Sequence, residues 1–74
     1  MHRMETAIRL KLAKRIKELR KRKGLTQEQL SELSGIDYKH IQLLESNRTP
    51  DAKLDTIEKL AKAFGISPSK LLKF

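Results

Sequence analysis

Residues 25–45 place the strongest constraint on the fold, because two short amphipathic helices are separated there by one glycine-centred turn. The segment reads LTQEQLSELSGIDYKHIQLLE. Thr26 is a capping residue and Gln29, three positions later, completes a capping box, so a helix is predicted to begin at Gln27. Gly35 is predicted to end this helix, since glycine adopts the left-handed backbone conformation at low cost.

Each of the two helices has one predicted apolar side. In the first, Leu30 and Leu33 are expected to form the buried stripe. The residues of that helix expected to face water are Gln27, Glu28 and Glu32. Asp37 is predicted to cap the second helix, whose core side carries Ile41 and Leu44.

The other side of the second helix is predicted to stay exposed. At about 100° per residue, Lys39, Leu43 and Ser46 project away from the core side, and Gln42 lies at their flank. Two helices of this length joined by a glycine-containing turn form a helix-turn-helix.

This pattern resembles the motif of the lambdoid phage repressor and Cro proteins, the XRE-like regulators. The matching residues are Gln27, Leu30, Gly35, Ile41, Leu44 and Glu45, and the resemblance extends from about Ile16 to Leu72. It implies an all-α fold, a compact five-helix repressor-like DNA-binding domain with the helix-turn-helix at helices 2 and 3. Ser31 departs from a usual alanine and Asn47 from a common glycine. Both departures are mild, because serine is small and asparagine tolerates the left-handed conformation.

The rest of the chain is predicted to form three more helices within a single domain, residues 1–74. The first runs from Ala7 to Lys23, and its stripe is Ile8, Leu12, Ile16 and Leu19. The fourth follows a loop over 46–51 and ends at Gly65; its apolar face is Leu54, Ile57, Leu60, Ala61 and Phe64. Ser67 and Pro68 begin a short last helix. Residues 1–6 carry no pattern and are expected to be poorly ordered.

Two charged residues flank these apolar stripes. Arg20 lies beside the first stripe and Glu45 beside Ile41 and Leu44, where an unpaired carboxylate would be costly. We therefore expect a bidentate salt bridge between Arg20 and Glu45, a role that the resemblance also implies. Lys14, Lys17 and Lys21 lie opposite the stripe; they are interpreted as a solvated face that adds only long-range attraction.

The charge balance points to a polyanionic partner. Seventeen Lys and Arg against nine Asp and Glu give a formal net charge of +8 in 74 residues, which favours nucleic acid. With no cysteine, disulfides and thiolate metal sites are excluded. No membrane-length apolar run or signal region is present, so a cytoplasmic, nucleoid-associated protein is expected. No metal site or cofactor is expected, and no set of residues suggests an enzyme.

The resemblance also implies which residues meet double-stranded DNA. The residues implied to read bases in the major groove are Asp37, Tyr38, Lys39, Gln42 and Leu43. Phosphate binding falls to Gln27, Ser46, Asn47 and Arg48. Leu43 either packs on a thymine methyl or is simply a tolerated exposed leucine, and Tyr38 either lies on the sugar-phosphate backbone or shields the turn.

One chain reads few bases, so a homodimeric repressor on an inverted-repeat operator is predicted. Leu72 and Phe74 exceed what the short last helix can bury and are predicted to form the dimer interface; a frayed apolar terminus is the other interpretation. Two functional alternatives remain open. One is an antitoxin or restriction-modification controller that binds DNA and a protein partner, such as a toxin or other effector. The other is a helical protein-interaction module that has lost DNA binding.

Overall fold

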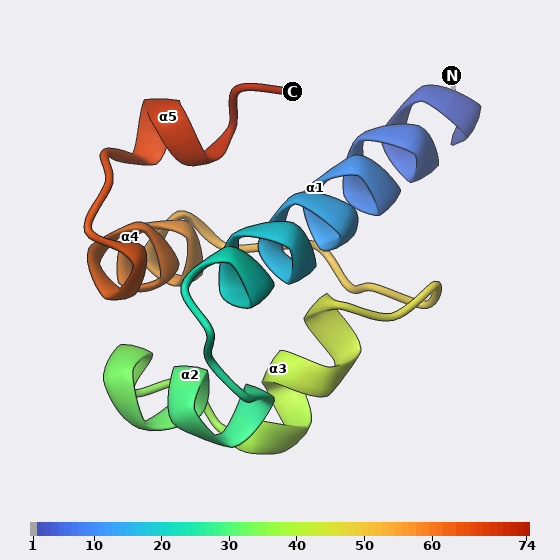
Figure 1. Cartoon of the computed structure of the whole chain (residues 1–74). Helices are drawn as coiled ribbons and strands as arrows, with labels where there is room; N and C mark the ends of the chain where they lie inside the picture. Colours follow the sequence, from blue (N-terminus) through green and yellow to red (C-terminus); the bar gives the residue numbers. More distant parts are fainter. Residues whose placement is uncertain (1) are drawn as a thin grey trace.

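The computed structural model describes residues 2–74, with side chains from residue 7 onward, and the regular elements in this part of the chain are helices (Figure 1). They are α1 (His2–Arg22), α2 (Gln27–Ser34), α3 (Tyr38–Leu44), α4 (Leu54–Phe64) and α5 (Pro68–Leu71). The predicted five-helix, all-α fold is confirmed. α1 begins at His2 rather than at the predicted Ala7. Residues 1–6 were expected to be poorly ordered; Met1 and the side chains of this segment lie outside the described part of the chain.

The ends of α2 follow from the local sequence as predicted. Thr26 Oγ1 accepts from the Gln29 backbone N–H at 3.0 Å, and the Thr26 N–H donates to Gln29 Oε1 at 2.9 Å. Gly35 ends the helix in the left-handed conformation, with φ of 75°. The Ser31 hydroxyl donates to the carbonyl of Ile36, so the serine that replaces the family's alanine ties α2 to the turn.

Side-chain caps also begin α3 and α5. Asp37 Oδ2 accepts from the Lys39 N–H at 3.2 Å, and Ser67 Oγ accepts from the Lys70 N–H at 3.2 Å. Among the described residues, only glycines have positive φ. Asn47 therefore does not use the left-handed conformation, and its replacement of a glycine causes no strain of that kind.

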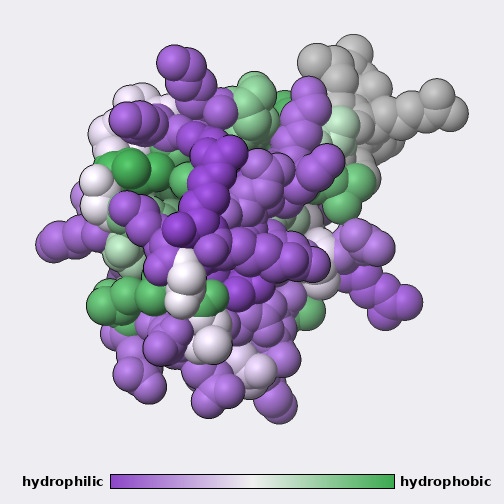
Figure 2. All heavy atoms as spheres, in the orientation of Figure 1, coloured by the Kyte–Doolittle hydropathy of each residue, from purple (hydrophilic) through white to green (hydrophobic). Residues whose placement is uncertain are grey.

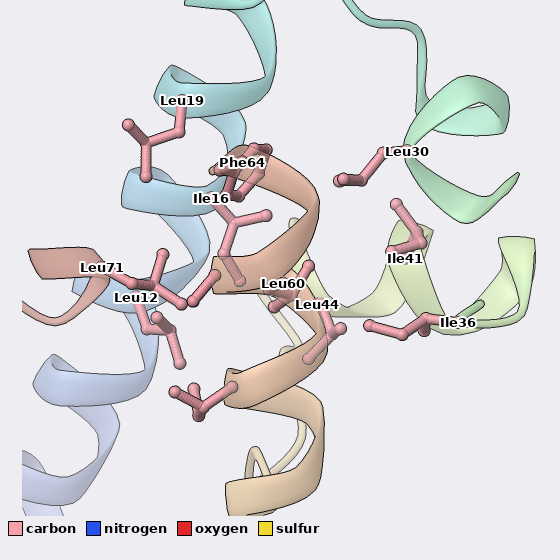
Figure 3. Packing of buried hydrophobic residues seen from close by; sticks show 12 residues of the cluster. Leu12, Ile16, Leu19, Leu30, Ile36, Ile41, Leu44, Leu60, Phe64 and Leu71 are labelled. Atoms are coloured by element: carbon pink, nitrogen blue, oxygen red, sulfur yellow. The ribbon is translucent and has the colours of Figure 1, made fainter. Parts of the chain in front are cut away.

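One hydrophobic core joins all five helices (Figure 3). The close view shows side chains from α1 and α4 pointing toward those of α2, α3 and α5. The buried members are Leu12, Ile16, Leu19, Leu30, Ile36, Ile41, Leu44, Ile57, Leu60, Ala61, Phe64 and Leu71. α4 is central to the packing, because it contacts α1, α2 and α5. This core holds α3 with Ile41 and Leu44 inward.

Leu33 does not belong to the core, and its predicted burial is wrong: 60% of it is exposed. The side of α2 that packs inward carries Leu30 together with the half-buried Gln27, Ser31 and Ser34. At 100° per residue, the centre of that group lies about 100° away from Leu33. The spacing of Leu30 and Leu33 predicts one apolar stripe, but the core covers only the side of that stripe on which Leu30 lies.

Ile8 and Leu54 are also exposed, at 54% and 86%, although both were predicted to be buried. Leu54 is the first residue of α4, and helical side chains point back toward the N-terminus, so Leu54 lies over the preceding loop instead of the core. Ile8 lies near the N-terminal end of α1, beyond the buried stripe that begins at Leu12. Both line one hollow together with Leu72.

Candidate nucleic-acid interface

The outer face of α3 is built by the periodicity of its sequence. Ile41 and Leu44 are fully buried, and this fixes the rotation of the helix about its axis. The side chains that consequently point outward are Tyr38, Lys39, Gln42 and Leu43, all of them exposed. The sequence predicted this division of the second helix into a core side and a mixed polar and apolar outer side, and the structure has it on a helix of seven residues. Ser46 was also predicted to project outward, but it is half-buried.

Two of these side chains are bonded to each other. Gln42 Nε2 donates to Tyr38 Oη at 3.2 Å, across one turn of α3. Because an amide has two N–H donors and a carbonyl acceptor, Gln42 keeps one donor and its acceptor for another molecule. The bond holds the Tyr38 ring along the helix surface, and it limits the rotamers of Gln42.

Leu43 is 49% exposed and lies in a shallow hollow whose other lining residues are Lys39, Gln42 and Ser46. The hollow therefore brings together an apolar side chain, a cation and an amide. Such a combination matches the edge of a base pair, which presents a methyl group beside hydrogen-bonding atoms.

The segment after α3 is organised by Ser46. Its hydroxyl donates to the Leu43 carbonyl at 2.7 Å and accepts from the Arg48 N–H at 3.2 Å. The hydroxyl's proton is thus committed to holding the turn, while the side chains of Asn47 and Arg48 are exposed. At the other end of the motif, Gln27 is half-buried rather than water-facing, because its Nε2 donates to Glu45 Oε1 at 3.3 Å.

Arg20 and Glu45 join α1 to the end of α3. Arg20 Nε donates to Glu45 Oε2 at 2.8 Å and Nη2 donates to Oε1 at 3.0 Å, the bidentate geometry expected from the sequence. The two side chains are 11% and 2% exposed. Arg20 Nη1 also donates to the Leu25 carbonyl at 2.8 Å. A single guanidinium therefore fixes α1, the turn into α2 and the end of α3 relative to one another.

Arg15 is a structural residue that the sequence analysis missed. Its Nε donates to the Leu71 carbonyl at 3.2 Å and its Nη2 to the Lys70 carbonyl at 2.9 Å. The guanidinium thus satisfies carbonyls at the C-terminal end of α5, where a positive charge is favoured. Its position among many basic residues of α1 gave no sign of this role, because the partner lies 55 residues away.

The two residues predicted to form the dimer interface lie in different places. Leu72 shares its hollow with Ile8 and Leu54, whereas Phe74 lies in another, with Lys11, Arg15 and other residues of α1. Both are about half exposed. Leu72 is therefore part of an apolar patch, which we define as Ile8, Leu54 and Leu72, and Phe74 lies outside it.

The described residues contain no cluster of three or more His, Cys, Asp or Glu that could hold a metal ion. In the same part of the chain, the helices are too short or too polar to cross a membrane.

The chain matches the model of a protein family and is similar to two transcriptional regulators. The model of a helix-turn-helix family matches residues 16–71. The HTH-type transcriptional regulators PuuR of Escherichia coli (strain K12) and of Shigella flexneri are each 37% identical over 57 residues, which is 77% of this chain. The match covers 30% of the length of those regulators.

A solved structure is similar over nearly its whole length. The restriction-modification controller protein C.AhdI from Aeromonas hydrophila is 40% identical and superposes with a TM-score of 0.82. The match covers 88% of the present chain and 97% of the controller. Both kinds of relative carry regulator names, and the family match spans α2 and α3 in full.

Proposed function

The chain belongs to the helix-turn-helix family of Cro/C1-type transcriptional regulators, and on this premise we propose that it is a dimeric repressor that reads an inverted-repeat operator. The observation that carries the proposal is the outer face of α3. This face has a cation, an amide and an apolar side chain together on a helix whose other side is locked into the core. An α-helix is about 10–12 Å across with its side chains, so α3 fits a major groove about 12 Å wide.

Base reading divides among the exposed side chains of α3. Lys39 donates to O6 or N7 of guanine, and Gln42 uses its remaining donor and acceptor on adenine. Leu43 packs against a thymine methyl. Asp37 uses one carboxylate oxygen in its cap and has the other for a cytosine amino group. Tyr38, bonded to Gln42, orients that amide and lies toward the sugar-phosphate backbone.

Phosphate contacts flank this reading face. Asn47 and Arg48 are exposed after α3, and the backbone N–H groups at the start of α2 favour an anion beside Gln27. Because the Ser46 hydroxyl is committed to the turn, its contribution is to hold Asn47 and Arg48 in place and to offer an acceptor. These contacts supply affinity that falls with salt, whereas the α3 face selects the sequence.

Dimerisation is the second part of the proposal. Two copies on an inverted repeat place their α3 helices roughly 34 Å apart, and the molecule measures 34 × 24 × 21 Å, a compatible size. The apolar patch of Ile8, Leu54 and Leu72 supports a self-complementary contact. Arg9 and Asp51, paired at 2.9 Å, lie beside it as a polar rim. Phe74 contributes from outside the patch.

A restriction-modification controller is the second candidate function. It is favoured by the similarity to C.AhdI over 97% of that controller's length. With this function the chain would bind DNA through the same α3 face, in the cytoplasm and on the nucleoid, and only the controlled genes would differ. An antitoxin with a protein partner uses the same α3 face for DNA and a further surface for the toxin. A pure protein-interaction module would leave that face unused.

Selection of bound duplexes from a random pool tests the proposal, with the stoichiometry of the complex measured by sedimentation. We expect an enriched inverted repeat and two chains per duplex. Enrichment of a single half-site with one chain bound would refute the dimer, and absence of any enriched sequence would refute the regulator. The genes beside the coding sequence then separate a controller or an antitoxin from a repressor of another operon.

A further inference from the structure

A hollow between α1 and the end of α3 brings basic residues to the segment that follows the reading helix. It is lined by Leu10, Ala13, Lys14, Lys17, Glu45, Ser46 and Asn47. Lys14 and Lys17 are exposed. In the sequence they are members of a long basic run, and nothing there links them to residues some 30 positions away. The fold links them because the Arg20–Glu45 salt bridge joins α1 to the end of α3.

The position of the two lysines follows from Arg20. On an α-helix, Lys17 lies about 60° and Lys14 about 120° around the axis from Arg20, both in the same direction. Arg20 is held by Glu45 at the C-terminal end of α3, and the hollow lies on that side of α1. The lysines therefore continue outward from the salt bridge, along the edge of α1 next to Ser46 and Asn47.

The electrostatic balance of the hollow is positive. Its only carboxylate belongs to Glu45, which is 2% exposed and already paired with Arg20. Neither Lys14 nor Lys17 forms an ion pair with a residue that the structure describes. The hollow thus presents two ammonium groups beside the polar atoms of Ser46 and Asn47. Figure 2 shows that the surrounding face, over α1 and α3, is covered mainly by hydrophilic side chains.

We propose that Lys14 and Lys17 form a phosphate-binding site that grips the DNA backbone next to the phosphate held by Asn47 and Arg48. This site rests on the DNA-binding part of the proposed function, because it requires α3 to lie in the major groove, but it does not require α3 to select a sequence. When α3 docks, the segment after it meets the sugar-phosphate backbone, and Lys14 and Lys17 line the hollow beside that segment. A flexible lysine acts there as a point charge that needs no fixed geometry.

This assignment replaces the interpretation of Lys14 and Lys17 as a solvated face. A solvated lysine contributes only through the long-range field, which changes affinity without a bound counterion being displaced at its site. A lysine that neutralises a phosphate releases a counterion and adds about 0.9 to the slope of log K against log salt. The two roles therefore differ in a quantity that can be measured.

The test compares three forms of the full chain on the selected operator. The first is wild type, the second carries Lys14→Gln and Lys17→Gln, and the third carries Lys62→Gln and Lys70→Gln. Glutamine has nearly the helix propensity of lysine, so folding is preserved. Lys62 and Lys70 are exposed residues of α4 and α5, and α5 lies far from the loop after α3 (Figure 1). The control thus removes the same charge elsewhere.

Fluorescence anisotropy gives the affinity of each form over about a tenfold range of salt. We expect the salt slope to fall by about 1.8 per bound chain for the Lys14/Lys17 variant, and to stay at the wild-type value for the control. Equal slopes for the two variants would overturn the proposal. Operators with single neutral methylphosphonates supply a second readout. One or two positions that weaken wild type should lose their effect in the Lys14/Lys17 variant, and an identical profile in all three forms would also overturn it.

The outcomes separate this site from the function on which it rests. If wild type binds DNA without sequence preference and the slope still falls, the operator-reading proposal fails and the phosphate site stands. If wild type selects an operator and the Lys14/Lys17 variant has the same salt slope as the control variant, the proposal of a phosphate site fails and the proposal of a regulator stands. If wild type binds no DNA at any salt concentration, both fail.

Discussion

Removing the carboxylate of Glu45 should destabilise the protein severely. Glu45→Ala leaves the Arg20 guanidinium, 11% exposed, with only the Leu25 carbonyl as a partner. It also removes the acceptor of Gln27. Breaking a buried pair by deleting one partner costs about 3–5 kcal/mol. The remaining bond and the slight exposure of Arg20 place the expected loss near the lower end, at about 3 kcal/mol.

A loss of about 3 kcal/mol is a large part of the free energy of unfolding of a protein of this size. A chain of 74 residues has a free energy of unfolding of about 4–11 kcal/mol. Urea unfolding followed by circular dichroism should therefore show a much lower midpoint for Glu45→Ala, with an unchanged slope. Lys59→Ala is the matched control, because Lys59 forms an exposed pair with Asp55 at 3.1 Å; its effect should stay below about 1 kcal/mol.

A double variant identifies the source of the effect. Arg20→Met with Glu45→Leu replaces both charges by apolar side chains of similar size, and such replacements are often neutral or stabilising. We expect it to recover most of the stability lost in Glu45→Ala. A loss of stability below about half a kcal/mol in Glu45→Ala would refute the reasoning, because leaving a buried charge without its partner costs about 3–5 kcal/mol. A double variant as unstable as the single one would assign the loss to packing instead of charge.

Three further predictions concern other parts of the molecule. Leu43→Ala should remove the preference for thymine at one position of each half-site in a repeated selection; an unchanged preference would exclude the methyl contact. Leu72→Glu should shift the protein toward monomer in sedimentation, whereas Ser69→Glu, an exposed change of the same charge on α5, should not; equal behaviour would exclude the patch from the interface. Gly35→Ala should cost about 1–2 kcal/mol in urea unfolding, since φ is 75° although no atom lies within 4 Å of the added Cβ. Gly35→Asn should cost less, and equal costs would contradict the backbone explanation.

Much of the candidate site could be predicted from the sequence, because helix caps and helical periodicity depend on residues that are close together in the chain. Thr26 and Gln29 cap α2 through atoms three residues apart, and Gly35 ends it through its own backbone. The burial of Ile41 and Leu44 sets which side of α3 faces outward, so the exposure of Leu43 follows from periodicity. Arg20 and Glu45 were also identifiable, because each lies beside an apolar stripe where a single charge would be costly.

The tertiary structure decided everything that depends on which edge of a helix is covered. Leu33, Ile8 and Leu54 carry the same apolar pattern as their buried neighbours, yet they are 60%, 54% and 86% exposed.

The neighbours of three other basic residues of α1 could not be predicted from the sequence. Arg15 reaches the end of α5, and Lys14 and Lys17 line one hollow with Ser46 and Asn47, although all three basic residues look alike in one basic run. Helical periodicity reports the direction of a side chain around its own axis, and it contains no information about the partner in that direction. The sequence alone therefore determined the helices and the outer face of α3, whereas the tertiary structure decided which residues of other elements lie beside the basic residues of α1.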